Sequence, residues 1–244
     1  MRTFIIPMVG QSKRFLDAGF TLPKYMLYLD KSSLFNRSIS SFKEYFGSSM
    51  FIFIARDIFE TKKFIENECK LLNLTNYKII ILDFVTKGQA ESTYLALQHA
   101  EIRNTSEVFI FNIDSFYKKY RIIIDCCDGY LDVFNGLGDH WSFASLISED
   151  SNVVKETIEK QRISNNCSTG LYYFKTAELF IKAYLNMYGC SVNSDMEHYI
   201  APMYNYLIKY NYKVLVNKVK AEDICFCGTP DEFKQTLQNV INEK

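Results

Sequence analysis

The stretch that decides the fold is Thr3-Phe4-Ile5-Ile6-Pro7-Met8-Val9-Gly10-Gln11-Ser12-Lys13-Arg14-Phe15. It opens with a short apolar run, residues 3–9, which ends at Gly10, as in a strand buried on both faces of a sheet. Residues 50–54, 78–82 and 108–112 repeat this pattern, and residues 33–45, 57–72 and 90–100 are expected to be helices. Strands alternating with helices predict a Rossmann-like α/β fold with a mixed, mainly parallel sheet flanked by helices.

The pattern changes after Asp114. Residues 142–147, 153–158 and 168–174 are expected strands without helices between them, and residues 176–188 and 196–210 are expected helices. Ser194-Asp195-Met196-Glu197 fits a capping box for the second helix, and Thr229 followed by Pro230 fits the start of a last one. We expect a single domain made of two halves, residues 1–118 and 119–244.

The composition excludes several classes of protein. The 28 Lys and Arg residues equal the 28 Asp and Glu residues, so nothing indicates the broad basic surface of a nucleic-acid binder. We find neither a signal segment nor a run of about 18 apolar residues, and therefore expect a cytoplasmic protein without membrane insertion. Seven Cys residues, an odd number in a chain of this size, are expected to be reduced thiols.

Two basic loops follow the first strand. Gly10 to Phe15 and Leu22-Pro23-Lys24-Tyr25 leave the carboxyl edge of the predicted sheet, where α/β proteins bind ligands. Small residues let backbone N–H groups approach phosphate oxygens, and Arg14 and Lys24 add cationic donors. The alternative interpretation is a pair of solvated basic turns.

These loops resemble the signature of the sugar-phosphate nucleotidyltransferase family, which reads Gly-x-Gly-x-Arg and then Pro-Lys. Ser12 stands in place of the second Gly, so we expect a backbone conformation there that tolerates a Cβ atom. The resemblance implies a GT-A-like fold in which residues 1–118 bind the nucleotide and Arg14 and Lys24 are catalytic. It also implies nucleotide contacts from Val9, Gly10, Gln11, Ser12 and Lys13.

Two further segments resemble the donor half of this family. Thr86-Lys87-Gly88-Gln89-Ala90 is similar to its Gly-Gln-Ala segment, which implies that Gly88 and Gln89 approach the nucleobase. The alternative for this segment is an ordinary helix start. Phe109-Ile110-Phe111-Asn112-Ile113-Asp114 is similar to its metal motif, which implies that Asp114 holds Mg2+ and that Asn112 lies beside the nucleotide.

The second half resembles the acceptor half of the family. Glu159-Lys160 and Ser168-Thr169-Gly170-Leu171-Tyr172 imply that Lys160 binds an acceptor phosphate and that Glu159, Thr169 and Gly170 contact the rest of the acceptor. Glu197 is a further acceptor candidate. Gly228-Thr229-Pro230 matches a late family segment, but Phe226 stands where a second metal-binding Asp is usual, and Asp223 is the candidate to replace it.

The resemblance implies transfer of a nucleoside monophosphate from a nucleoside triphosphate to a small phosphorylated acceptor, with Mg2+ as cofactor. Leu-Pro-Lys-Tyr together with residues 197–205 is similar to bacterial capsule-pathway members, which favours CTP as donor and phosphoglutamine as acceptor. A hexose-1-phosphate uridylyl- or thymidylyltransferase is the nearest alternative. A glycosyltransferase would favour Asp-x-Asp where this chain has Asp114-Ser115-Phe116, and a nucleotide sensor is a third interpretation. A homo-oligomer is compatible with all of these.

Overall fold

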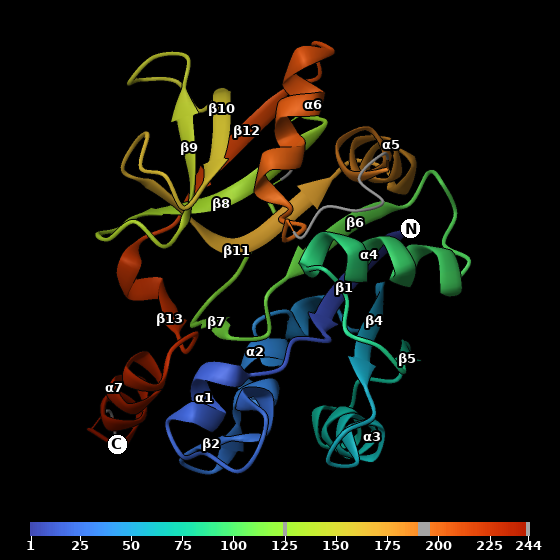
Figure 1. The fold of residues 1–244 in the computed structure, drawn as a ribbon, viewed down its shortest axis with the longest axis vertical. Coiled ribbons are helices and arrows are strands. Elements are labelled where there is room, and N and C mark those ends of the chain that lie inside the picture. Colours follow the sequence, from blue (N-terminus) through green and yellow to red (C-terminus); the bar gives the residue numbers. More distant parts are fainter. Residues whose placement is uncertain (124–125, 190–195, 243–244) are drawn as a thin grey trace.

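The computed structural model describes residues 1–123, 126–189 and 196–242, and one nine-stranded sheet runs through them (Figure 1). Its strands are β1 (Arg2–Met8), β4 (Ser49–Arg56), β5 (Tyr77–Leu82), β6 (Glu107–Phe111), β8 (Gly129–Asn135), β9 (Ser142–Leu146), β10 (Val154–Glu159), β11 (Asn166–Phe174) and β12 (Val214–Lys218). The main path is β10-β9-β11-β6-β1-β4-β5, and β8 pairs with β11 and β12. Two small sheets pair β2 (Tyr28–Leu29) with β3 (Ser32–Ser33) and β7 (Ser115–Tyr117) with β13 (Ile224–Phe226).

The centre of the sheet is parallel. Strand β1 runs parallel to both β4 and β6, and β5 extends this set beside β4. Strand β11 then pairs antiparallel with β6 and joins the second part of the chain to the first. The predicted α/β fold with a mixed, mainly parallel sheet flanked by helices is confirmed.

Helices cover both faces of the sheet because its central strands are apolar on both sides. The helices are α1 (Lys13–Asp17), α2 (Leu34–Ser40), α3 (Thr61–Leu72), α4 (Gln89–His99), α5 (Ala177–Tyr188), α6 (Tyr204–Lys209) and α7 (Pro230–Asn242), with short 3-10 turns at Lys24–Met26, Lys43–Tyr45, Ala201–Met203 and Ala221–Asp223. In β1, Ile5 belongs to the core beneath α4 and α5, whereas Phe4 and Ile6 belong to the core beneath α2 and α3. Successive side chains of a strand point to opposite faces, so one strand supplies both cores.

The C-terminal elements return to the first part of the chain. Strand β13 pairs antiparallel with β7, and α7 follows beside α1 (Figure 1). Phe233 of α7 packs edge-on against Phe15 of α1, with ring centroids 6.0 Å apart. The last residues of the chain are therefore placed next to the first basic loop.

Three expected helices are shorter than predicted, and the one expected over residues 57–72 begins only at Thr61. The helix expected over residues 33–45 ends at Ser40, although Ser33 caps it as expected by accepting a hydrogen bond from the Asn36 amide. The helix expected over residues 196–210 is only Tyr204–Lys209, preceded by a 3-10 turn, because residues 196–199 run without helix and bond to other parts of the chain. Ser194 and Asp195 of the predicted capping box lie outside the described residues.

Strands β8 and β12 were missed by the sequence analysis. Strand β8 is buried along almost its whole length, but Gly129 and Asp132 interrupt its apolar pattern. The Asp132 carboxylate accepts hydrogen bonds from the Tyr117 hydroxyl at 2.8 Å and the Asn217 amide at 2.9 Å. These partners are far away in the sequence, so the local pattern gave no sign that an Asp fits in a buried strand.

None of the helices in the described ranges has both the length and the apolar character to cross a bilayer. No disulfide joins any of the cysteines that the structure describes.

Candidate active site

A cavity of about 620 Å³ opens where β1 and β6 end. The chain passes from β1 to β4 on one side and from β5 back to β6 on the other, so the strand order reverses at this point. Such a reversal leaves a crevice at the carboxyl ends of the strands. The predicted site residues that line the cavity are Val9, Gly10, Ser12, Lys13, Arg14, Lys24, Gly88, Gln89, Asn112, Asp114, Glu159, Thr169, Gly170 and Glu197.

Ser12 ties the two basic loops together. Its hydroxyl accepts a hydrogen bond from the backbone N–H of Lys24 at 3.2 Å. The backbone of Ser12 has φ 52° and ψ 28°, the left-handed region, which a residue with a Cβ atom can adopt at a cost but which favours glycine. The bond to Lys24 offsets this strain and leaves the hydroxyl proton free to be donated towards the cavity.

Lys24 and Asp114 meet inside the cavity. The Lys24 Nζ lies 2.6 Å from Asp114 Oδ2, and both side chains are about three-quarters buried, with exposures of 23% and 25%. The second basic loop is thus joined directly to the segment after β6, and Ser12 links it to the first loop, which presents Lys13 and Arg14. A cationic side chain and a carboxylate therefore lie side by side in the cavity.

A second carboxylate approaches Asp114 from the start of α7. A Cβ added to Gly228 would lie 3.4 Å from Asp114 Oδ2 and 3.4 Å from Glu232 Oε2, so both carboxylates face the small space beside Gly228. Mg2+ takes oxygen ligands and is commonly held by one or two carboxylates together with substrate phosphates. Asp114 and Glu232 fit that requirement. No cluster of three or more metal-binding side chains occurs in the part of the chain that the structure describes.

Gly88 and Gln89 lie where α4 begins, against residues 196–199. The His198 N–H donates to the Lys87 carbonyl at 2.9 Å, and the Ala90 N–H donates to the His198 carbonyl at 3.0 Å. A Cβ on Gly88 would lie 2.5 Å from the His198 carbonyl oxygen, so this contact itself requires glycine. The buried Gln89 Oε1 has no hydrogen-bond partner among the described residues, and Gln89 is one of the residues that line the cavity.

A bulge in β11 shapes the floor of the cavity. The register of β11 against β8 shifts between Ser168 and Tyr172, and Gly170 within this shift has φ +88°. Its carbonyl accepts a hydrogen bond from the Asn112 N–H at 3.1 Å, and an added Cβ would lie 2.7 Å from Asn112 Nδ2. Beside it, the Thr169 hydroxyl bonds the Tyr117 hydroxyl at 2.7 Å.

The far end of the cavity is acidic and aromatic. Glu159, at the end of β10, accepts a hydrogen bond from the Ser142 hydroxyl, and burial raises the pKa of its carboxyl group. Lys160 pairs instead with Glu197, 3.8 Å away, and donates to the Tyr199 hydroxyl. Aromatic side chains that line the cavity include His140, Trp141, Tyr172, Tyr199 and Phe226.

Three predicted site residues do not border the cavity. Gln11 lines a separate hollow of about 220 Å³ with Leu16, Pro23 and Arg56, on the other side of the turn at Ser12. Lys160 lies behind Tyr199 and Glu197, with its side chain 49% exposed. Asp223 faces Lys118, because β13 runs antiparallel to β7. The Cys227 N–H donates to the Asp114 carbonyl at 2.7 Å. Asp223 lies four residues before Cys227, which is about 13 Å of extended chain, and so lies away from Asp114.

The sequence analysis missed several residues of the cavity wall. Glu232 has a local signal, because Thr229 and Glu232 form a capping box: the Thr229 N–H donates to Glu232 Oε2 at 2.9 Å, and the Glu232 N–H donates to Thr229 Oγ1 at 3.2 Å. That signal accounts for the helix start and gives no sign that Glu232 also lies near Asp114. Trp141 and His140 lie in a loop that has no motif, so only the fold brings them here.

The structure resembles solved nucleotidyltransferases over its whole length. A nucleoside-diphosphate-sugar pyrophosphorylase from Vibrio cholerae RC9 is 37% identical, with a TM-score of 0.89 over 96% of this chain and 99% of that one. The chain belongs to the nucleotidyltransferase family. An inositol-1-phosphate CTP transferase from T. maritima has 15% identity and a TM-score of 0.75, over 98% and 96% of the two chains.

A third nucleotidyltransferase, the CTP:phosphocholine cytidylyltransferase from Streptococcus pneumoniae, has 15% identity and a TM-score of 0.72, over 98% of this chain and 100% of that one. At this identity the likeness shows the shared fold. No protein-family model and no curated protein sequence matches the chain. For a nucleotidyltransferase, a basic loop, a carboxylate at the end of β6 and a separate acidic end are a consistent set of parts.

Proposed function

We propose that this nucleotidyltransferase moves a nucleoside monophosphate from a nucleoside triphosphate, preferably CTP, to a small phosphorylated acceptor, preferably phosphoglutamine. Pyrophosphate is released, and the product serves as a precursor of capsule or other surface polysaccharide in the cytoplasm. The observation that carries the proposal is the contact between Lys24 and Asp114, 2.6 Å apart, at the meeting point of a basic loop and an acidic, aromatic pocket.

In the proposed reaction, the acceptor phosphate attacks the α-phosphorus in line with the departing pyrophosphate. Lys24 and Arg14 offset charge on the transferring and leaving phosphates, and the N–H groups of residues 10–13 orient them. Asp114 and Glu232 would hold Mg2+, which supplies further charge neutralisation at the phosphates. A phosphate monoester is already largely dianionic at neutral pH, so positioning and electrostatics suffice without a general base.

The base-binding end is proposed to lie at the start of α4. The unpartnered Gln89 Oε1 can accept a hydrogen bond from the exocyclic amine of cytosine, while its amide NH2 group can donate to a ring nitrogen or carbonyl. Leaving this buried oxygen unpaired has a cost of the order of 1–3 kcal/mol, which a base would remove. The same amide can also pair with uracil, so the preference for CTP rests on the resemblance to capsule-pathway members.

The acidic end supports an acceptor that carries an ammonium group. Glu159 is partly buried and has no ion pair among the described residues, since Lys160 pairs with Glu197. A carboxylate desolvated in this way is stabilised when a cation binds beside it. Burial is the largest cause that raises the pKa of Glu159, and the nearby Glu197 carboxylate adds to it, although the Ser142 hydroxyl and Lys160 act in the opposite direction. An amino-acid phosphate such as phosphoglutamine offers that cation, whereas a hexose phosphate offers only hydroxyl groups.

A hexose 1-phosphate acceptor is the second candidate. It is favoured by the 37% identity to a protein described as a nucleoside-diphosphate-sugar pyrophosphorylase. Carboxylates also accept hydrogen bonds from sugar hydroxyls, so both acceptors fit the acidic end.

The proposal is tested by assaying every donor nucleotide with every acceptor. The protein is incubated with Mg2+ and each of CTP, UTP, dTTP, GTP and ATP, against phosphoglutamine, phosphocholine and glucose 1-phosphate, and pyrophosphate release is followed. We expect the highest kcat/KM for CTP with phosphoglutamine. A preference for glucose 1-phosphate with UTP or dTTP would establish the second candidate, and no pyrophosphate with any pair would overturn both.

A further inference from the structure

The loop between β8 and β9 forms part of the wall at the acidic end of the cavity. Its last residues, His140 and Trp141, border the cavity. The Trp141 ring packs between Phe134 and Phe226, with centroid distances of 5.1 Å and 4.9 Å. Leu137, Gly138 and Asp139 are exposed, with Leu137 91% accessible, so this part of the loop has little buried surface of its own to fix its shape.

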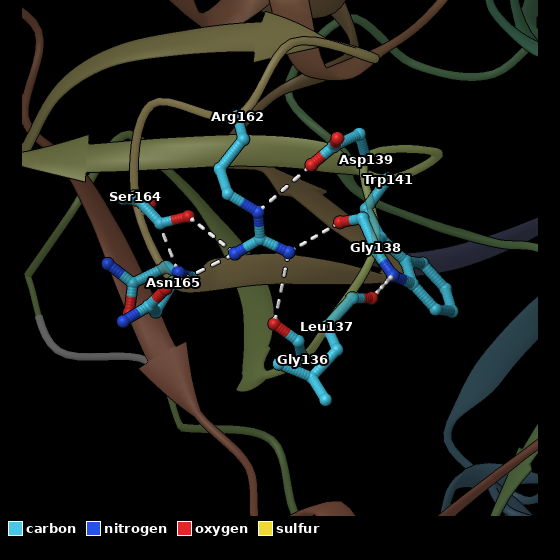
Figure 2. A network of polar contacts seen from close by, with 9 residues as sticks. Gly136, Leu137, Gly138, Asp139, Trp141, Arg162, Ser164 and Asn165 are labelled. Carbon is cyan, nitrogen blue, oxygen red and sulfur yellow. Dashed lines mark hydrogen bonds and ion pairs between the residues drawn. The ribbon is translucent and has the colours of Figure 1, made fainter.

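Arg162, in the loop between β10 and β11, is not among the residues that line the cavity, and it bonds the β8–β9 loop (Figure 2). Its Nη2 group donates to the carbonyls of Gly136, at 3.2 Å, and Gly138, and its Nε donates to Asp139 at 3.1 Å. Its Nη1 group donates to the Ser164 carbonyl and the Asn165 side chain, both at 3.2 Å. A guanidinium group has five N–H donors, and here each of them has an acceptor.

The backbone contacts are the important part of this network. Asp139 is 75% exposed, and an ion pair so open to solvent contributes little on its own. By contrast, two N–H groups donate to carbonyls of the β8–β9 loop, and two donate to Ser164 and Asn165 in the loop that contains Arg162. The planar guanidinium thereby fixes the two loops against each other. The Phe143 ring lies beneath it, 4.9 Å from centroid to Cζ. A lysine has neither the fork nor the flat face.

The clamped loop lies directly beside the proposed acceptor pocket. The Trp141 carbonyl accepts a hydrogen bond from the Lys160 N–H at 2.9 Å, and the neighbouring Ser142 bonds Glu159. Trp141, the residue before Ser142, and Glu159 thus line the same cavity. An aromatic face beside a carboxylate is suited to an ammonium group, because both attract positive charge.

We propose that Trp141 contacts the bound acceptor and selects among acceptors, and that Arg162 is the positioning residue that holds Trp141 in place. The proposal rests on the proposed function, because it takes the acidic end of the cavity as the acceptor site. It assigns no role in nucleoside triphosphate binding to either residue.

Trp141 is the only tryptophan of the chain, so intrinsic fluorescence reports on this wall alone. Emission of the wild-type protein is recorded during separate titrations with phosphoglutamine, glucose 1-phosphate and CTP. We expect an acceptor phosphate to change the emission at concentrations near its KM, and CTP alone to change it little. An emission that responds to neither acceptor overturns the contact with Trp141.

Kinetics test the positioning role. Arg162→Lys and Trp141→Ala should each raise the KM for the acceptor about 10-fold or more while the KM for CTP stays within about twofold. Trp141→Phe should recover part of the loss. In Arg162→Lys the emission change on adding acceptor should be reduced, because the indole is no longer held against the ligand.

Arg2→Lys is the matched control. Arg2 has a similar exposure, 26% against 29%, with an ion pair to Glu107 and aromatic neighbours, but it lies at the opposite end of β1 from the cavity. Thermal unfolding of each variant identifies general destabilisation. If Arg162→Lys and Arg2→Lys leave the acceptor KM equally unchanged, the positioning role is overturned while the proposed function stands. If the wild type uses no acceptor at all, the proposed function fails, and the fluorescence titrations alone decide whether Trp141 faces a ligand.

Discussion

At the scale of single residues, the candidate site depends on a few side chains with two roles. Ser12 holds a strained backbone while it binds Lys24, and Glu232 caps a helix while it faces Asp114. A substitution at such a position changes both the local structure and the candidate site. The useful variants are those that change one role and preserve the other.

Glu232→Gln separates the helix cap from the proposed metal site. Glutamine can form the same capping box, so the free energy of unfolding should change by less than about 0.5 kcal/mol. The anionic oxygen is lost, so binding of Mn2+, measured by electron paramagnetic resonance in the presence of CTP, should weaken about 10-fold or more.

Two further variants serve as controls for the Mn2+ binding measurement. Asp231→Asn removes the same charge from the exposed neighbouring residue and should leave Mn2+ binding unchanged. Asp114→Asn should abolish most Mn2+ binding and most turnover. If Asp114→Asn weakens binding and Glu232→Gln does not, Glu232 acts only as a cap. If neither does, the metal site lies elsewhere.

Ser12→Ala and Ser12→Gly separate the contribution of the Ser12 hydrogen bond from that of the left-handed backbone strain. Both lose the hydrogen bond to Lys24, but glycine also relieves the left-handed strain, which is of the order of 1 kcal/mol. Urea unfolding should therefore show Ser12→Ala to be less stable than Ser12→Gly by about that amount. Equal stabilities would mean that the left-handed conformation carries no strain here.

At the scale of elements, the site is completed by residues 196–199, which bond to the start of α4. These residues bring Glu197 and Tyr199 to the acidic end of the cavity. Their two backbone hydrogen bonds, through His198, are made to residues on either side of Gly88. The close approach at Gly88 therefore links the proposed base-binding end to the proposed acceptor end.

Gly88→Ala should displace this segment. The new Cβ would meet the His198 backbone oxygen at 2.5 Å and its nitrogen at 2.8 Å, which no side-chain rotation can relieve. We expect a loss of about 1–3 kcal/mol in the free energy of unfolding, together with a higher acceptor KM. Gly47→Ala, where nothing lies within 4 Å of an added Cβ, is the control and should change neither measurement. An unaltered acceptor KM in Gly88→Ala would show that the segment does not contribute to acceptor binding.

At the scale of the whole molecule, a buried acid couples the sheet to the site. Asp132 in β8 is fully buried and bonds Tyr117, whose hydroxyl also bonds Thr169 beside the cavity. Burial raises the pKa of Asp132 from 3.8 to about 7, although its hydrogen bonds from Asn217 and Tyr117 act in the opposite direction. The carboxyl group is thus held in the fold close to its point of ionisation at neutral pH.

This raised pKa predicts a loss of stability as pH rises. The folded state holds the proton more tightly than the unfolded state, so the contribution of Asp132 is fully present below about pH 4 and is lost as pH rises through about 7. Asp132→Asn lacks this ionisation. The free energy of unfolding is measured with urea for both proteins. Between pH 5 and pH 8 the difference, variant minus wild type, should increase by the order of a few kcal/mol. In the control Asp150→Asn, which alters an exposed residue, the free energy of unfolding should depend on pH as it does in the wild type. If Asp132→Asn also showed the same pH dependence as the wild type, the pKa of Asp132 would lie near its ordinary value.

The sequence by itself determined the central buried strands β1, β4, β5 and β6, the helices between them, the strand ends near Gly10 and Asp114, and the helix start at Gln89. These features depend on the periodicity of neighbouring residues and on residues such as glycine that end a strand, so a short window of sequence contains them. The family resemblance added roles for Arg14, Lys24 and Asp114, and the structure brings all three to one cavity.

Only the tertiary structure decided which of several plausible side chains reach that cavity. Asp223 and Glu232 are both acidic residues near Gly228, yet the antiparallel pairing of β13 with β7 carries Asp223 away and leaves Glu232 beside Asp114. Asp132 in a buried strand and Trp141 in an exposed loop likewise depend on partners 15 to 85 positions away in the chain. Such contacts arise when distant segments pack together, and their stability comes from burial and hydrogen bonding across the fold rather than from local preference.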